Sequence, residues 1–105
     1  MTTELEFYMD AQGMPCARGA DERLAVYLQT DLQGSTELTQ ELIRLLEDPG
    51  FEGDFSGNAH CVDFRENSVS IEALHDEAAP DRVLSRKEML DCARAWLGFI
   101  SQPAR

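Results

Sequence analysis

Residues 60–73, HCVDFRENSVSIEA, carry the clearest strand pattern of the chain. Side chains that can face a core recur at every second position on both sides of the central RENS: His60, Val62 and Phe64 before it, and Val69, Ile71 and Ala73 after it. A period of two is typical of a half-buried β-strand, and a short polar segment between two such runs is typical of a turn. We therefore predict a β-hairpin with one face toward the core.

A second hairpin is predicted at the start of the chain. LEFYMD (5–10) alternates in the same way, AQGMP (11–15) is rich in turn formers, and MPCARG (14–19) can return as a short strand. Because proline cannot donate a hydrogen bond to a neighbouring strand, Pro15 indicates an edge position or an irregular start of this strand.

Two helical segments are predicted between the hairpins. ERLAVYLQTDLQ (22–33) follows Asp21, a favourable N-cap, and ELTQELIRLLED (37–48) follows Ser35 and Thr36, either of which can cap it. The expected buried positions have helical spacing in both segments and are Leu24, Tyr27, Leu28 and Leu32 in the first and Leu38, Leu42, Leu45 and Leu46 in the second. Gly34 lies between them, and the pattern fits one bent helix or two consecutive helices.

The final helix carries the strongest signal in the chain. Ser85 and Glu88 have the spacing of a capping box, and Pro103 follows the last apolar residue. An apolar stripe runs along the segment through Met89, Ala93, Trp96, Leu97 and Ile100. The element order is therefore ββ-α(α)-ββ-α. It predicts a single α+β domain over 1–105, with an antiparallel sheet built from the two β-hairpins and helices packed on one face.

Composition limits the classes of partner. The chain has 20 acidic and 9 basic residues, a formal net charge of −11. Such a surface repels nucleic acid and anionic lipids, which bind proteins mainly through Lys and Arg, and it attracts basic proteins. The same charge also serves simply to keep a small protein in solution. We expect no nucleic-acid partner and no membrane partner.

The N-terminal residues and the cysteines indicate the compartment. MTTELEFYMD lacks the basic start and apolar core of a signal peptide, and no apolar run approaches the roughly 20 residues that span a bilayer. Three widely spaced cysteines form neither a disulfide framework nor a CxxC pair. We expect a cytoplasmic protein with reduced thiols.

SGNAHCVDF (56–64) raises the question of catalysis, because His60, Cys61 and Asp63 are side chains that a thiol hydrolase or a metal site uses. Neighbouring residues of a strand point to opposite faces, so Cys61 and Asp63 face away from His60. We therefore predict that His60 is a packing residue that bonds through one ring nitrogen. No other segment has the spacing of metal ligands or of a nucleophile and base. We expect no enzyme activity, no metal and no cofactor.

Two acidic segments are predicted to be exposed loops on either side of the second hairpin. EDPGFEGD (47–54) belongs to a loop that continues to residue 59, and HDEAAPD (75–81) belongs to a loop over 75–83. Aromatic residues lie among the acids of the first loop, and apolar anchors inside an anionic rim suit the capture of a basic protein. The expected partner-binding residues are Phe51, Glu52, Asp54, Phe55, Asp76, Glu77 and Asp81.

This order of segments resembles small bacterial immunity proteins, which are encoded beside contact-dependent growth inhibition toxins and other polymorphic toxins. The resemblance covers LEFYMDAQG, LAVYLQTDLQGSTELTQELI, SGNAHCVDF with VSIE, and AWLGFI. It implies a cytoplasmic antitoxin that binds a cognate toxin domain, often a nuclease, and blocks its active site or its access to substrate. The alternative is a housekeeping interaction or regulatory module that acts as a homodimer.

Overall fold

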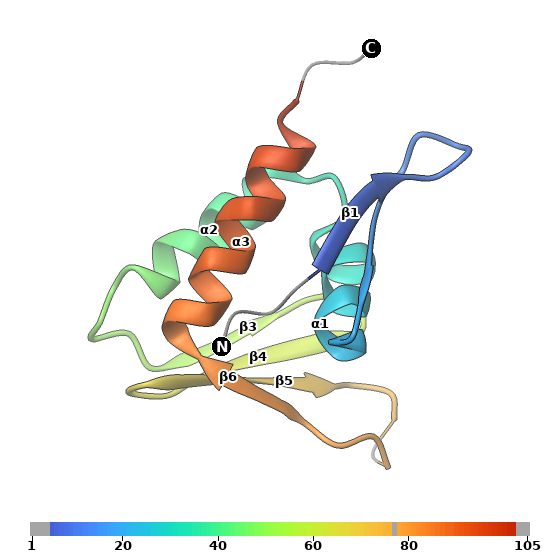
Figure 1. The fold of residues 1–105 in the computed structure, drawn as a ribbon. Coiled ribbons are helices and arrows are strands. Elements are labelled where there is room, and N and C mark those ends of the chain that lie inside the picture. Colours follow the sequence, from blue (N-terminus) through green and yellow to red (C-terminus); the bar gives the residue numbers. More distant parts are fainter. Residues whose placement is uncertain (1–4, 77, 103–105) are drawn as a thin grey trace.

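The hairpin predicted over 60–73 forms the centre of a four-stranded antiparallel sheet. The computed structural model describes residues 5–76 and 78–102 (Figure 1). Strand β4 (His60–Phe64) pairs with β5 (Ser68–Ala73), with Val62 opposite Ile71 and Phe64 opposite Val69. These four side chains are buried, so the face predicted from the alternation is confirmed.

Two further strands flank this hairpin and correct the predicted loops. Strand β3 (Gly53–Ser56) pairs with β4, and β6 (Arg82–Ser85) pairs with β5, which gives the order β3-β4-β5-β6. Each has four residues, too few to show a period of two among glycines and charges. Their backbone N–H and C=O groups are paired because β4 and β5 lie beside them.

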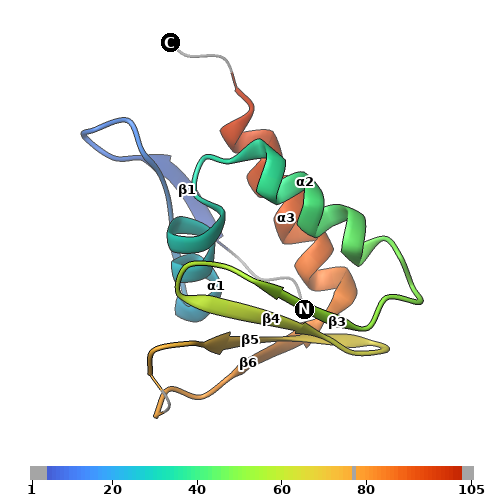
Figure 2. The same ribbon diagram turned by 180° about the vertical axis from the view of Figure 1, so that it is seen from behind.

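The N-terminal hairpin does not join this sheet. Strands β1 (Leu5–Met9) and β2 (Pro15–Gly19) form a separate two-stranded sheet, so the expectation of one sheet built from both hairpins is wrong. Phe7 packs instead against the last helix, with its ring 5.1 Å from that of Trp96 in a T-shaped arrangement. The hairpin stands away from the larger sheet in both views, with α1 between them (Figures 1 and 2). The α+β class itself is as predicted.

The two middle helical segments are separate helices. Helix α1 (Glu22–Tyr27) continues as a π-helix, η1 (Leu28–Leu32), and α2 (Thr36–Leu46) starts after a break. Gln33 adopts a positive φ of 52° at this break, and Ser35 caps α2 by accepting from the Leu38 N–H. A residue at positive φ cannot continue a right-handed helix, which decides between the two alternatives left by the sequence.

Helix α3 (Arg86–Ile100) begins at the predicted capping box, and both of its hydrogen bonds are present. Trp96 is fully buried, and its Nε1 donates to the Gln33 carbonyl at 2.9 Å. All the helices lie on one side of the four-stranded sheet (Figures 1 and 2). No described helix is long and apolar enough to cross a bilayer.

One position of the predicted core of α2 is wrong. Leu38 is 44% exposed, whereas its neighbour Thr39 is fully buried. The Thr39 hydroxyl donates to the Ser35 carbonyl one turn earlier, at 2.8 Å, so a threonine is accommodated in the core without an unpaired polar group. The packing face of α2 is therefore rotated from the leucine stripe at its first turn.

Candidate functional site

The four-stranded sheet has one face packed against the helices, and its other face is called the open face here. No described element covers it in either view (Figures 1 and 2). Strand pairing places one row of residues directly across all four strands: Asp54, Asp63, Ser70 and Val83. A second row on the same face contains Ser56, Cys61 and Glu72. Asp54 and Asp63 are neighbours in the first row, and Val83, at the other end of that row, is 55% exposed.

Two carboxylates face each other on this open face. Asp54 and Asp63 are directly opposite in the β3–β4 pairing, an arrangement of like charges that destabilises a sheet. Arg65 compensates in part, because its Nε donates to Asp63 Oδ2 at 2.7 Å. Asp54 and Glu72 form no ion pair among the described residues, although the Glu72 carboxylate lies near enough to Arg65 to help raise the pKa of that guanidinium. The open face is therefore anionic.

The basic side chains of residues 5–76 and 78–102 are all engaged within the molecule. Six of them form ion pairs with carboxylates: Arg18, Arg44, Arg65, Arg82, Lys87 and Arg94. Arg86 donates to four backbone carbonyls, and Arg23 contacts His60. Phosphate backbones bind proteins mainly through Lys and Arg, and here each of these described side chains has a partner within the molecule.

The predicted acidic residues lie at opposite ends of the sheet. Glu52 and Asp54 are exposed near the start of β3, whereas Asp76 and Asp81 are exposed in the segment between β5 and β6. The two ends are separated by about five strand residues, roughly 17 Å. Glu77 lies outside the described residues. The sequence had suggested that these acids form one patch around the hairpin, but the described ones lie in two separate groups.

The two predicted aromatic anchors face inward. Phe51 packs its ring 5.1 Å from that of Phe64 in a T-shaped contact, and Phe55 lies opposite the buried Val62. Both rings are half-buried against the hydrophobic core. Aromatic spacing in a polar segment does not distinguish an exposed anchor from a side chain that closes the edge of a core. Their contribution to the fold explains their presence.

Sequence reasoning missed Asp63 and Glu72 as members of an acidic face. Both alternate with apolar residues in β4 and β5, so the period that assigned the buried face also assigned these side chains to the other face. Their relation to Asp54 required the pairing of β3, which was not predicted. Strand alternation was the available signal for two of the three acids.

His60 and Cys61 point to opposite sides of β4, as expected. Cys61 lies on the open face beside Ser56, with 3.6 Å between Sγ and the hydroxyl, whereas His60 is 3% exposed on the core side. Burial raises the pKa of the Cys92 thiol to about 12. The thiolate is the reactive form of cysteine, and a raised pKa keeps Cys92 in the thiol form. Cys92 therefore acts as a small core residue.

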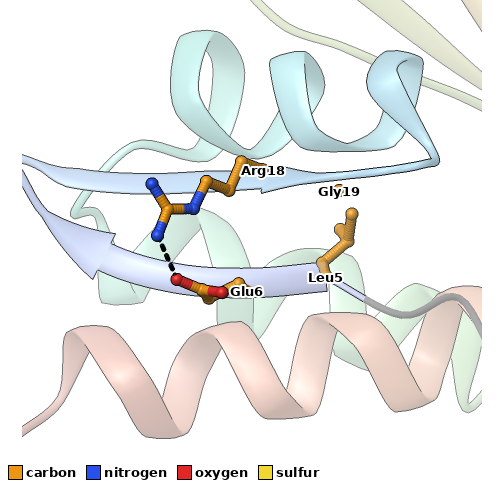
Figure 3. Close-up of a pocket in the computed structure, with 4 residues that line it drawn as sticks. All are labelled: Leu5, Glu6, Arg18 and Gly19. Atoms are coloured by element: carbon orange, nitrogen blue, oxygen red, sulfur yellow. Dashed lines mark hydrogen bonds and ion pairs between the residues drawn. The ribbon is translucent and has the colours of Figure 1, made fainter.

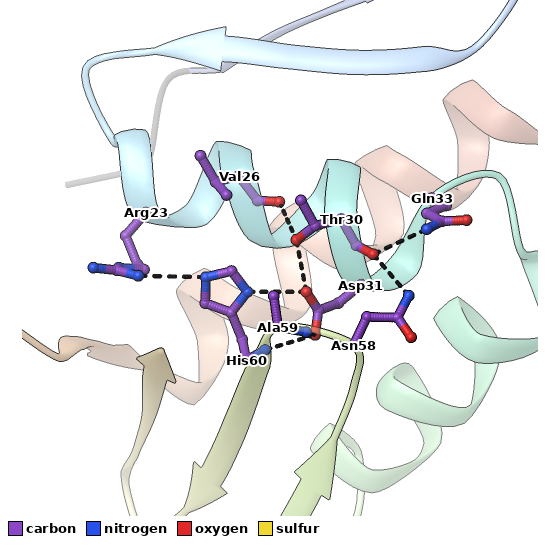
Figure 4. Close-up of polar contacts among 8 residues, drawn as sticks. All are labelled: Arg23, Val26, Thr30, Asp31, Gln33, Asn58, Ala59 and His60. Atoms are coloured by element: carbon purple, nitrogen blue, oxygen red, sulfur yellow. Dashed lines mark hydrogen bonds and ion pairs between the residues drawn. The ribbon is translucent and has the colours of Figure 1, made fainter. Parts of the chain in front are cut away.

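His60 belongs to a buried polar network that the sequence did not suggest (Figure 4). Its Nδ1 lies 2.9 Å from Asp31 Oδ1, and its Nε2 lies 3.3 Å from Arg23 Nη1. Asp31 Oδ2 also accepts from the backbone N–H groups of Ala59 and His60, at 3.2 and 3.0 Å. Both ring nitrogens of His60 are bonded, not one as predicted. A carboxylate at Asp31, within the apolar stripe of its helix, was the available signal, because a buried acid needs partners.

Both ring nitrogens of His60 are occupied by hydrogen-bond partners: Asp31 contacts Nδ1, and Arg23 contacts Nε2, the nitrogen that would act as a base. A Cβ at Gly57 would stand 2.2 Å from Asp31 Oδ2, so only glycine leaves room for the carboxylate to reach the β3–β4 turn. The geometry is that of a structural connection between η1 and the sheet.

A shallow pocket lies at the open end of the N-terminal hairpin (Figure 3). Its lining residues are Leu5, Glu6, Arg18 and Gly19, and the two charged side chains pair with each other across the strands. Arg18 also stacks over Tyr8, 4.7 Å from the ring centroid. The charges of the pocket are therefore satisfied internally. The described residues contain no group of three or more potential metal ligands.

Comparison with known proteins returned no family model, no curated protein and no solved structure that matches this chain.

Proposed function

We propose that this protein is an immunity protein that binds and neutralises a basic toxin domain in the cytoplasm, using the open face of its four-stranded sheet. The observation that carries the proposal is the distribution of charge. Every described Lys and Arg is engaged within the molecule, while Asp54 and Glu72 lie on the open face and form no ion pair there. The carboxylates in excess of these pairs give the chain its net charge of −11, which attracts a basic partner.

The fit to a toxin follows from the chemistry of the target. A domain that cleaves RNA or DNA needs a basic cleft for phosphate, and an acidic protein that fills the cleft excludes the substrate. Ser56 and Ser70 are short side chains on the open face, and Val83 supplies exposed apolar area at one edge. Charges direct the encounter, and contact with the sheet face slows dissociation.

The test first identifies a toxin domain encoded by a gene beside this one and then measures its association with this protein. The double variant Asp54→Asn/Glu72→Gln removes two charges from the open face. The matched control, Asp76→Asn/Asp81→Asn, removes two charges from the segment between β5 and β6. We expect the first pair to lower the association rate about tenfold and to flatten its dependence on salt. The control pair should change the rate less than about threefold.

Three results would contradict the proposal. The neighbouring toxin domain could be acidic, association could be insensitive to salt, or the protein could fail to protect cells that express the toxin. Equal effects of the two double variants would retain the electrostatic mechanism and reject the open face as the contact surface. A stable homodimer in light scattering that buries Val83 and fails to bind the toxin would favour the homodimeric module instead.

A further inference from the structure

Three charged or titratable side chains connect α1, η1 and β4. Arg23 comes from α1, Asp31 from η1 and His60 from β4 (Figure 4). An arginine only donates hydrogen bonds, and an ionised carboxylate only accepts them. The His60 ring must therefore donate from Nδ1 to Asp31 and accept at Nε2 from Arg23. This arrangement requires the neutral ring in its Nδ1–H tautomer.

The surroundings of the ring leave few other charges to consider. The His60 and Asp31 side chains are 4% and 1% exposed. Tyr27 meets the ring edge to face at 5.9 Å between centroids, and burial raises the pKa of its hydroxyl, so it stays neutral. Across the sheet, β5 contributes Ala73, which does not titrate. Arg23 and Asp31 are the two charged groups that contact the ring directly, so a change in the charge of His60 acts first on them.

A proton on His60 affects the two contacts in opposite ways. It places an N–H at Nε2, which then faces the N–H groups and the positive charge of Arg23. At Nδ1 it turns the hydrogen bond to Asp31 into an ion pair. Arg23 is half-buried at the surface of α1 and has water within reach, whereas Asp31 is held by the backbone of the β3–β4 turn. Arg23 is the group that can leave.

We propose that His60 is a proton-sensitive connector: the neutral ring holds Arg23 against the sheet, and the protonated ring releases Arg23 while it stays bound to Asp31. The fold remains intact in this transition, because the anchoring of the turn by Asp31 is retained. The other described Lys and Arg side chains all have partners within the molecule. Acidification therefore adds one available guanidinium, on α1, to an otherwise anionic surface.

The experiment follows His60 and Arg23 by NMR in ¹⁵N-labelled protein. The chain has two histidines, so His75→Gln, a change at an exposed loop residue, leaves His60 as the only imidazole signal. At pH 8 we expect a proton on Nδ1 and none on Nε2. As the pH falls, the Arg23 side-chain signals should shift with the same midpoint as the His60 ring, while the backbone amide spectrum stays folded.

Arg23→Ala in the same background is the matched control. Without the facing guanidinium, His60 should take up its proton at a higher pH than in the parent, and the ring should keep its Nδ1 contact. A proton on Nε2 at pH 8, Arg23 signals that do not follow His60, or loss of the folded spectrum at the His60 midpoint would each overturn the proposal. An unchanged midpoint in Arg23→Ala would do so as well.

Discussion

Arg86 shows how much a single side chain contributes to the assembly of the fold. Its two terminal nitrogens donate to the carbonyls of Leu45, Asp48, Phe51 and Arg65 at distances of 2.8–3.2 Å. The guanidinium also lies over the Phe64 ring, 5.5 Å from its centroid. The last carbonyls of a helix lack partners within it, and the planar fork of arginine can serve several at once. Arg86 thus joins the end of α2 to the β4–β5 turn.

We predict that Arg86→Ala lowers the free energy of unfolding by about 2–4 kcal/mol, because several carbonyls lose a charged donor. Arg86→Lys should recover only part of the loss, because an ammonium group lacks the planar fork. Urea denaturation measures both values. Lys87→Ala is the control, since its ion pair with Asp91 is exposed and should contribute less than about 1 kcal/mol. Equal losses for Arg86→Ala and Lys87→Ala would contradict the assigned role.

Among the elements, α3 is the one whose packing organises the others. Its Trp96 contacts Phe7 of the N-terminal hairpin and bonds to the carbonyl of Gln33 before α2. The capping box at Ser85 and Glu88 defines where the helix begins, and hydrogen bonds from Ser85 lower the pKa of the Glu88 carboxyl. Helix α2 lies beside α3 but exposes Leu38 at its first turn. Leucine spacing alone does not reveal this difference.

We predict that Trp96→Ala costs about 3–5 kcal/mol, the usual range for deletion of a buried aromatic side chain. Leu38→Ala should cost less than about 1 kcal/mol, because nearly half of that side chain already faces solvent. Chemical denaturation followed by circular dichroism compares the two, since Trp96 is the only tryptophan and its fluorescence is lost in the variant. A cost for Leu38→Ala as large as that for Trp96→Ala would show that Leu38 packs in solution.

At the scale of the whole molecule, charge repulsion opposes compaction. The chain carries a net charge of −11 within a radius of gyration of 13.1 Å. Between about 10 mM and 150 mM salt, the screening length falls from about 30 Å to about 8 Å. The first value is comparable to the molecular dimensions of 40 × 31 × 26 Å, and the second is well below them. The surface ion pairs weaken over the same range, but each contributes little. Net repulsion should therefore decide the sign of the salt effect.

We predict that the melting temperature rises as salt increases over this range. The increase should be smaller in Asp54→Asn/Glu72→Gln, which carries two fewer negative charges. Differential scanning calorimetry at constant pH measures both proteins. Sucrose, which strengthens burial without screening charge, should raise the melting temperatures of the two proteins equally. A melting temperature that falls with salt would mean that the ion pairs outweigh the net repulsion.

The sequence by itself determined the two hairpins, the capped helices, the burial of Trp96 and the separation of His60 from Cys61. These features depend on periods of two and of about 3.6 residues and on caps within one turn, which are local properties of the chain. The element order also limited the fold to the α+β class. The acidic composition, in turn, led to the proposal of a basic partner.

Only the tertiary structure decided which distant segments meet. The Asp31–His60 contact spans 29 residues, and Arg86 reaches Leu45 across 41. The short edge strands β3 and β6 exist because β4 and β5 offer them backbone partners, and this pairing in turn creates the acidic row on the open face. It also turns Phe51 and Phe55 toward the core. Contacts of this kind depend on the packing of the whole chain, because each is favourable only after the two segments have been brought together.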